Sequence, residues 1–220
     1  ANLIREGLSP RQSFISGSPM KEVISSVMTK VDASNVLEDL NLGLKQYFVC
    51  SLHRQENVEN KTRLQNLIEL LRHAQKKYGK KLVISVHPRT NQRVSEHGLS
   101  WPKGSIVSEP FGFVDYLRLQ KDSFATISDS GTLAEESGLL GFLALSPRES
   151  TERPEAFDLG LVSLVGDSAE ALDEAILRFD PENPRQLPTE YEEEKFSQRV
   201  ANILLSTARN RDKIIGDEVT

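Results

Sequence analysis

The 220-residue chain has the length of one generous domain or of one and a half small ones. Hydrophobic residues make up 38% and charged residues 27%, a composition that excludes a disordered or fibrous chain. The 32 acidic side chains outnumber the 27 basic ones and give a net charge of −5, so we expect no broad basic face for a nucleic-acid backbone. A small basic pocket for one phosphorylated ligand is compatible with this balance.

The apolar runs fall short of the ~20 residues of a membrane span, and no basic-then-apolar signal peptide opens the chain. The single cysteine, Cys50, cannot form an internal disulfide, which fits a reducing compartment. We therefore expect a cytoplasmic protein with no membrane partner. The opening ANLIREGLSP has no Met and reads as internal sequence, so we expect a fragment of a longer protein.

Short β-rich runs alternate with helical patterns along the chain. Strands are predicted over 47–51, 82–86, 106–107, 124–127, 142–145 and 161–165. Helices are predicted over 113–119, 132–140, 168–178 and 190–205, and one more carries Leu64, Leu67, Ile68 and Leu71 on one face and ends at Gly79. A Pro-punctuated linker is predicted over 180–188.

This alternation, with short connections, predicts a parallel sheet covered on both faces. The expected fold class is α/β, a Rossmann-like doubly wound parallel sheet, which binds ligands beyond the carboxyl ends of its strands. Polar clusters follow predicted strands at 53–57 (HRQEN), 87–89 (HPR), 128–136 (SDSGTLAEE) and 148–155 (RESTERPE). Their convergence on one rim of the sheet predicts a binding site there.

The cluster at 128–136 has the character of an anion site. Ser130 and Gly131 lie between a strand and a helix start, where free backbone N–H groups and the helix dipole attract a phosphate. The alternative is that Ser130 only caps the helix. Either Glu135 or Glu136 is expected to face the rim and accept hydrogen bonds from a ribose diol; the alternative is a solvated acidic first turn.

Two histidines end predicted strands in the same region. His53 and His87 can donate to a phosphate or transfer a proton, although a lone histidine is more often a structural hydrogen-bonding group. Arg148 and Arg153 offer bidentate anion contacts, with a solvated loop of internal ion pairs as the alternative. Tyr116, like Phe111, either stacks on a base or belongs to the core.

Several familiar chemistries lack their motifs. The sequence has no G-x-x-x-x-G-K-[ST] loop and no G-x-G-x-x-G fingerprint. Ser130 lies between Ser128 and Thr132 and not between the glycines of a G-x-S-x-G elbow. Glu56 is followed by Asn57 instead of the second histidine of a metalloprotease motif, and no cysteine cluster exists. We therefore expect no metal and no redox cofactor.

Taken in order, these clusters resemble the C-terminal half of UDP-N-acetylglucosamine 2-epimerases. The family pattern is H-R-x-E-N, H-P, D-S-G-G-x-x-E-E and T-T-E-R-P-E, and four ordered motifs form a specific signal. The resemblance implies the C-terminal half of a two-domain GT-B fold. Residues 1–185 would form the UDP-binding domain with an N-terminal crossover segment, and 186–220 would form a helix that crosses back to an absent N-terminal domain.

The resemblance also implies roles for individual residues. Ser130 and Gly131 would bind the diphosphate, Glu136 the ribose hydroxyls, and His53, the one catalytic candidate, would contact the diphosphate and help UDP depart. Tyr116 matches a position near the uracil. The remaining substrate-binding candidates are Arg54 and His87 at a second or allosteric nucleotide-sugar pocket, Arg153 facing the cleft, and Glu56 and Thr132 as members of the matched motifs.

In the family, UDP leaves C1 as C2 loses its proton, and a 2-acetamidoglucal forms. The proton then returns on the opposite face of C2, and UDP adds back. The acid/base carboxylates come mostly from the first domain, so we expect this chain alone to bind UDP weakly and not to turn over. Partners would be a UDP-sugar, the N-terminal domain and, as is common in the family, a second copy in a dimer.

One departure bears on the sugar. Thr132 stands where the family has its second glycine, as in the branch that forms UDP-N-acetyl-L-fucosamine from its talosamine epimer for surface polysaccharides such as capsule and O-antigen. Both branches stay open at this point. The other open alternatives are a GT-B glycosyltransferase, a hydrolysing 2-epimerase and a nucleotide-sensing module without catalysis.

Overall fold

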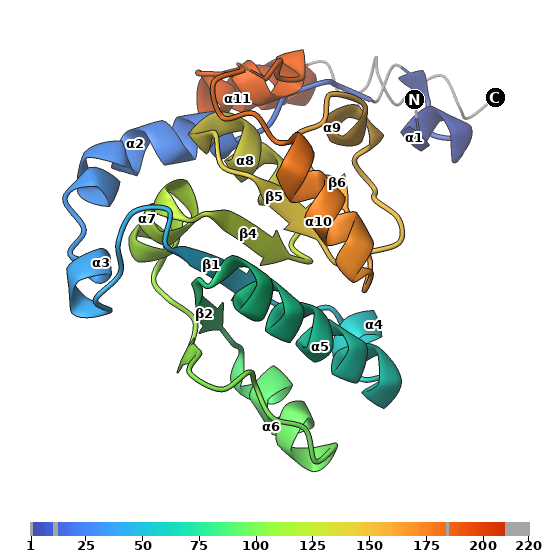
Figure 1. The fold of residues 1–220 in the computed structure, drawn as a ribbon. Helices are drawn as coiled ribbons and strands as arrows, with labels where there is room; N and C mark the ends of the chain where they lie inside the picture. The colour runs from blue at the N-terminus through green and yellow to red at the C-terminus, as the bar shows by residue number, and fades with distance from the viewer. Residues whose placement is uncertain (1, 11–12, 184, 210–220) are drawn as a thin grey trace. The chain divides into compact units, whose positions relative to one another are not determined.

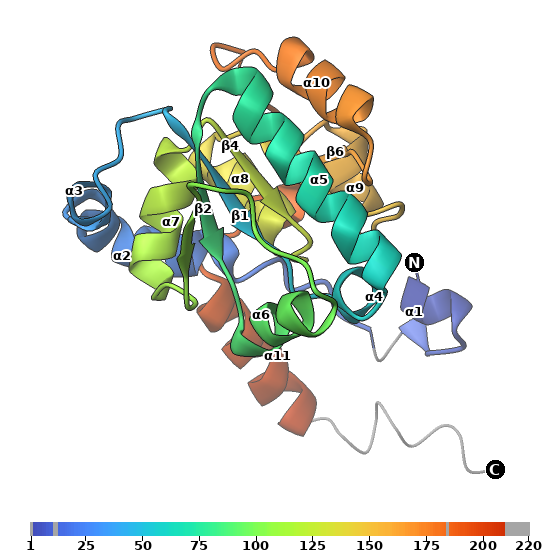
Figure 2. The ribbon, with the colours of Figure 1, turned by 60° about the horizontal axis from the view of Figure 1, so that its bottom comes forward.

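The computed structural model describes residues 2–10, 13–183 and 185–209. Six parallel strands form one sheet in the order β3-β2-β1-β4-β5-β6, shown in Figures 1 and 2. The strands are β1 (Tyr47–Ser51), β2 (Lys81–Ser85), β3 (Ile106–Ser108), β4 (Ala125–Ser128), β5 (Ala144–Ser146) and β6 (Ser163–Leu164). The predicted doubly wound parallel sheet is confirmed.

Helices connect the strands and cover the sheet. Strands β1, β3, β4 and β6 are followed along the chain by α5 (Lys61–Tyr78), α7 (Phe113–Asp122), α8 (Leu133–Leu140) and α10 (Ala169–Arg178). The other helices are α1 (Asn2–Arg5), α2 (Met20–Asp32), α3 (Val36–Asp39), α4 (Gln55–Val58), α6 (Pro88–Glu96), α9 (Pro154–Asp158), the 3₁₀-helix η2 (Thr189–Glu192) and α11 (Phe196–Arg209). The alternation predicted from the sequence is therefore present along the sheet.

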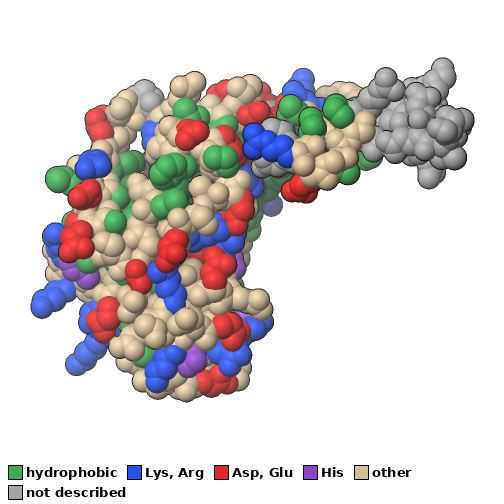
Figure 3. Space-filling model, turned by 90° about the vertical axis from the view of Figure 1, so that its right-hand side faces the viewer, with side chains coloured by type: hydrophobic (Ala, Val, Ile, Leu, Met, Phe, Trp, Pro, Cys, Tyr) green, Lys and Arg blue, Asp and Glu red, His purple; other side chains and the backbone are tan. Residues whose placement is uncertain are grey.

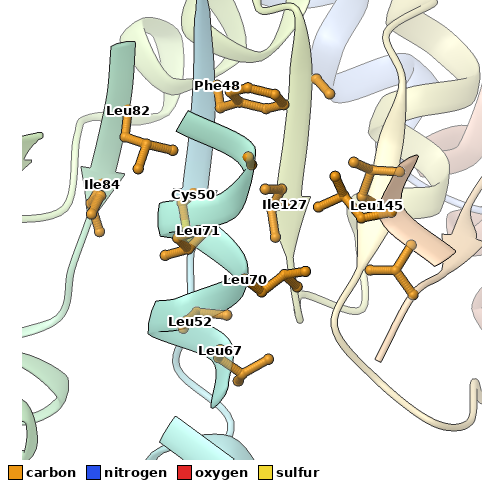
Figure 4. Packing of buried hydrophobic residues seen from close by; sticks show 14 of the residues in the cluster. Phe48, Cys50, Leu52, Leu67, Leu70, Leu71, Leu82, Ile84, Ile127 and Leu145 are labelled. Carbon is orange, nitrogen blue, oxygen red and sulfur yellow. The ribbon is translucent and has the colours of Figure 1, made fainter. Parts of the chain in front are cut away.

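Both faces of the sheet are buried, because successive residues of a strand point to opposite sides. Phe48 and Cys50 face a cluster that includes Leu71 of α5, as Figure 4 shows. Tyr47 and Val49 belong to the cluster on the other side, where α3 and α7 pack. Burial on two sides explains why the strands read as continuous apolar runs rather than alternating ones.

Helix α5 shows how the sequence sets both ends of an element. The Asn60 side chain accepts a hydrogen bond from Arg63 N at 3.0 Å and caps the first turn. Leu67 and Leu71 are buried against the sheet, as the apolar stripe predicts. Gly79 ends the helix in the left-handed conformation, at φ 60°. The predicted helix and its end are confirmed.

The extents of two predicted elements are wrong. The strand expected over 161–165 is reduced to β6, Ser163–Leu164, because it is an edge strand and glycines with positive φ lie on both sides. The helix expected from residue 190 begins only at Phe196. Before it, the Glu193 carboxylate accepts a hydrogen bond from Lys195 N at 2.9 Å, a local bond that competes with helix formation.

Helix α6 was not predicted from the sequence, where residues 87–89 were read only as a polar cluster. Pro88 occupies its first turn, and of its residues only Thr90 and Val94 are buried. A helix with so narrow an apolar face gives little hydrophobic periodicity. Pro88 nevertheless marks the start of α6 in the sequence, because proline is favoured in the first turn of a helix.

The chain divides into two compact units. One spans Val27–Pro188 and contains the whole sheet; the other combines the described residues up to Ser26 with those from Thr189 onward. Within that second unit, Lys21 forms an ion pair with Glu194 at 3.0 Å. Of the predicted C-terminal segment 186–220, residues 210–220 lie outside the described residues. None of the described helices is long and apolar enough to cross a membrane.

Candidate functional site

The site lies where the strand order changes direction. Strands β1 and β4 are neighbours in the sheet, and from them the order runs outward to β2 and β3 on one side and to β5 and β6 on the other. Their ends are in register, with Ser51 beside Ser128. The change of direction between these two strands is the general ligand position in doubly wound sheets, and we call it the crevice between β1 and β4.

Asp129 joins the two loops at this crevice. Its side chain is fully buried and accepts hydrogen bonds from His53 N at 3.1 Å, Arg54 N at 3.0 Å and Asn57 Nδ2 at 2.9 Å. Burial opposes its ionisation, but the hydrogen bonds from His53 and Asn57 outweigh it and lower the pKa of Asp129. The sequence analysis quoted this residue within a motif but did not count it as a site residue.

The His53 side chain is held by the same carboxylate. Its Nδ1 lies 3.0 Å from Asp129 Oδ1, and the side chain is 48% exposed. The hydrogen bond to Asp129 raises the pKa of His53 despite partial burial, which acts in the opposite direction. Since Nδ1 is engaged by Asp129, Nε2 is the nitrogen that can meet a ligand. A histidine held in this way is suited to donating a proton to an anion.

The turn before α8 offers backbone groups to a ligand. Ser130 N donates to Ser128 Oγ at 3.1 Å, and the N-cap of the helix is Thr132, which makes no side-chain capping bond. Ser130 Oγ in turn accepts a hydrogen bond from Thr132 N at 3.4 Å, so part of the capping role considered for Ser130 is present although the N-cap itself is Thr132. A side-chain atom added at Gly131 would lie 4.0 Å from Arg54 Nη2, so this guanidinium lies above the turn. The helix N-terminus and Arg54 together favour an anion at this position.

Both acidic residues of α8 are buried, with exposed fractions of 3% for Glu135 and 6% for Glu136. The alternative of a solvated acidic turn is therefore wrong. Glu135 pairs with Arg153 at 3.2 Å, whereas Glu136 accepts hydrogen bonds from Gln120 Nε2 at 2.7 Å and Thr132 Oγ1 at 2.8 Å. Burial raises the pKa of Glu136, and the two hydrogen bonds oppose this shift.

The aromatic candidate lies between core and crevice. Tyr116, on α7, packs with the cluster that contains Tyr47 and Val49, as does Phe111. Burial raises the pKa of its hydroxyl, while the nearby Ser51 and Ser128 at the ends of β1 and β4 act in the opposite direction. The ring is partly buried, so Tyr116 combines the core role considered for it with a polar group at the crevice.

The arginine loop after β5 is locked by ion pairs. Arg148 is only 8% exposed and binds Glu152 through both Nη atoms, at 2.7 and 2.6 Å. Arg54 Nη1 lies 3.1 Å from the same carboxylate. These contacts lower the pKa of Glu152 to about 2, and the hydrogen bond from Arg148 has the largest effect. Glu56 lies 3.7 Å from Arg148 Nε and is exposed. The loop thus has the internal ion pairs considered above, around a buried arginine.

The structure brings three of the predicted residues into one pocket. Ser130, Gly131 and Arg153 line a narrow pocket together with Arg148 and Glu152. A separate hollow of about 450 Å³ between α9 and α10 contains none of the predicted site residues. On the face shown in Figure 3, acidic and basic side chains are interspersed, which suits a site for one small anion rather than for a polyanion.

His87 stands apart from this pocket. It is exposed, and its Nδ1 accepts a hydrogen bond from Arg89 N at 3.3 Å, so it caps α6. The adjacent Thr90 donates to Leu52 O at 3.1 Å, which fastens α6 to the loop after β1. The geometry of His87 matches the structural alternative considered for it, and its place at a second pocket stays a prediction.

Comparison with known proteins assigns the family. A family model described as UDP-N-acetylglucosamine 2-epimerase matches residues 1–205. The UDP-N-acetylglucosamine 2-epimerase of Methanocaldococcus jannaschii is 34% identical over 183 residues, which are 80% of this chain and 50% of that protein. The chain thus spans about half the length of the curated relatives it matches.

Solved structures agree in fold. The crystal structure of the M. jannaschii UDP-GlcNAc 2-epimerase in complex with UDP-GlcNAc and UDP matches 93% of this chain and 58% of that one, with a TM-score of 0.83 and 31% identity. A UDP-N-acetylglucosamine 2-epimerase from Rickettsia bellii matches 97% of this chain and 58% of that one, with a TM-score of 0.80 and 32% identity. The chain therefore belongs to the UDP-N-acetylglucosamine 2-epimerase family.

Proposed function

We propose that this chain is the nucleotide-binding half of a UDP-N-acetyl-sugar 2-epimerase. The observation that carries the proposal is the turn Ser130–Thr132 at the crevice between β1 and β4, with a buried carboxylate, Glu136, one helical turn further on. An anion site and a diol acceptor at this spacing fit a nucleoside diphosphate. The relative from M. jannaschii, whose structure holds UDP-GlcNAc and UDP, supports the same ligand class.

Each group has a role that its environment favours. Backbone N–H groups of the turn and the Arg54 guanidinium would bind the diphosphate. Glu136 would accept hydrogen bonds from the two ribose hydroxyls, and Tyr116 would lie near the uracil. His53, held by Asp129 with its pKa raised, would donate a proton through Nε2 to the departing diphosphate. Arg153 would face the sugar side of the crevice.

The reaction proposed for the whole protein is elimination and re-addition. The C2 proton and UDP leave to give a 2-acetamidoglucal, the proton returns on the opposite face, and UDP adds back at C1. The acid/base carboxylates would come from an N-terminal Rossmann-like domain, so this chain alone would bind UDP without turnover. The sugar is UDP-GlcNAc or its 2,6-dideoxy talosamine counterpart, for surface-polysaccharide synthesis, and product NMR distinguishes the two.

Calorimetric titration of the chain with UDP tests the site. We expect weak, saturable binding that falls by about 1–3 kcal/mol in Glu136→Ala, because hydrogen bonds to a charged group are lost. Glu135→Ala is the matched control, since this neighbouring carboxylate is engaged by Arg153. Unchanged affinity in Glu136→Ala would show that the ribose role is wrong. An obligatory sugar acceptor in a protein of the relatives' full length would instead indicate a glycosyltransferase.

A further inference from the structure

A fully buried glutamine occupies a core position of α7. Gln120 has an exposed fraction of 0% and lies one turn after Leu117, on the buried side of the helix. Its Nε2 donates to Glu136 Oε2 at 2.7 Å and so joins α7 to α8. Its Oε1 is also buried and has no hydrogen-bond partner among the described residues. The amide is therefore held by its bond to Glu136 alone.

Packing stability does not account for this glutamine. A buried polar atom without a partner costs about 1–3 kcal/mol relative to its hydrated state. A methionine has nearly the same length and volume, fills irregular core space well and carries no such cost. A half-satisfied amide is worse for a core than an apolar side chain. The role of Gln120 therefore lies in its hydrogen bond to Glu136.

That hydrogen bond fixes a carboxylate from one side while a second donor fixes it from the other. Thr132 Oγ1 donates to Glu136 Oε1 at 2.8 Å, so each carboxylate oxygen has one donor. The two donors come from different elements, α7 and the start of α8, and together they set the plane of the carboxylate. Each oxygen of an ionised carboxylate accepts about two hydrogen bonds, which leaves one acceptor position on each oxygen.

We propose that Gln120 is a positioning residue that aligns the Glu136 carboxylate to receive two neighbouring ribose hydroxyls. The inference rests on the proposed function, in which Glu136 binds the ribose. Gln120 itself does not touch the ligand. Its donated bond also favours the ionised form of Glu136, whose pKa burial raises, and thereby keeps the carboxylate an acceptor on both oxygens.

The test compares UDP with 2′-deoxy-UDP, which lacks one of the two hydroxyls. Four forms of the full 220-residue chain are each titrated with both nucleotides: the parent, Gln120→Met, Glu136→Ala and Leu119→Met. For the parent we expect UDP to bind about tenfold more tightly, as for one hydrogen bond to a charged acceptor. Gln120→Met is expected to bring this ratio below about threefold, while binding of 2′-deoxy-UDP is maintained and the urea midpoint does not fall.

Leu119→Met is the matched control, because Leu119 is fully buried in the same helix and lies in the cluster around Tyr47. It is expected to keep the parent ratio. An undiminished ratio in Gln120→Met would overturn the positioning role. A parent ratio that survives in Glu136→Ala would instead overturn the ribose role of Glu136, which is the proposed function.

A ligand-free measurement decides the case in which UDP does not bind. Carboxyl NMR of Glu136 is followed through a pH titration of the parent and of Gln120→Met. Loss of a donor to the ionised form is expected to raise the pKa of Glu136 in the variant. An unchanged pKa would show that Gln120 does not hold the carboxylate, whatever the nucleotide does.

Discussion

The two ends of α8 differ in the side chains that meet their backbone polar groups. At the C-terminal end, the Arg185 guanidinium donates to Ser137 O at 3.0 Å, to Phe142 O at 2.8 Å and to Leu161 O at 3.2 Å. At the N-terminal end, Thr132 makes no side-chain capping bond and turns its hydroxyl to Glu136 instead. One end is closed by a cation that complements the helix dipole, and at the other Thr132 N donates a long hydrogen bond of 3.4 Å to the neutral Ser130 hydroxyl, which an anion can replace.

This difference separates structural from functional use of the same helix. A helix end whose polar groups are met by protein contributes to stability, whereas an end left unmet is available to a ligand. Substitutions at the C-terminal end should therefore change the free energy of unfolding and leave nucleotide binding intact. Substitutions around the N-terminal end should change nucleotide binding more than the free energy of unfolding.

The largest expected effect is at the closed end. Arg185→Ala removes a charged donor from each of three carbonyl oxygens in and beside the last turn of α8, although Gly141 N and the Ser137 hydroxyl remain as donors to them. We expect a loss of about 2 kcal/mol in the free energy of unfolding. Urea unfolding measures this loss, and calorimetry on the folded variant is expected to give the parent's UDP affinity. Burial lowers the pKa of Arg185, so its guanidinium is partly desolvated and its hydrogen bonds are not freely exchanged for water.

Arg178→Ala is the control for Arg185→Ala. Arg178 is 78% exposed and pairs only with Glu174 among the described residues, at 3.1 Å, so we expect a change within about 0.5 kcal/mol. Equal losses in the two variants would show that Arg185 does not close the helix end.

Local sequence patterns predicted the fold and the residues at the N-terminal end of α8, but not the contacts at its C-terminal end. Strands and α5 were predicted because their apolar spacing is written in consecutive residues. Ser130, Gly131 and Glu136 were likewise found within one short motif. Their supporting residues lie far away in the chain: Gln120 is 16 residues from Glu136, Arg185 is 48 from Ser137, and Asp129 is 76 from His53.

Such pairings depend on how strands and helices pack, and no local periodicity encodes them. Gln120 lies one residue beyond the helix predicted over 113–119, and only the true extent of α7, to Asp122, places it one turn after Leu117 on the buried side. For Arg185 there was no signal, because it lies in a Pro-rich segment that reads as a linker. A single sequence thus locates groups that touch a ligand more readily than the groups that hold them.

A smaller effect is expected where the open end meets the loop after β1. Asp129→Asn keeps the size of the side chain but removes the negative charge that holds His53. We expect the pKa of His53 to fall and UDP affinity to drop about tenfold, since a charge-assisted bond that orients His53 is weakened. Histidine NMR titration and calorimetry measure the two effects.

The same variant tests a pH dependence. The pKa of His53 is raised in the folded parent, so the stability from its pairing with Asp129 is fully present below its unfolded value of ~6.5 and lost as pH rises through its folded value. Parent and Asp129→Asn should therefore differ less in free energy of unfolding at pH 9 than at pH 6. A constant difference would mean that His53 does not titrate against Asp129.

The smallest expected effect is at Thr132, where the chain carries a hydroxyl in place of the glycine usual in the family. Thr132→Val keeps the shape but removes the donor to Glu136, so we expect the preference for UDP over 2′-deoxy-UDP to fall about threefold. This loss is smaller than for Gln120→Met because Thr132 is only partly buried, whereas Gln120 is fully buried, and water replaces the Thr132 donor more readily. Thr132→Ser keeps the hydroxyl and should keep the preference. An equal loss of the preference in Thr132→Ser and Thr132→Val would show that the methyl group of Thr132, and not its hydroxyl, matters at this end of α8. The contrast between the two ends of the helix would then depend on Glu136 and Gln120 alone.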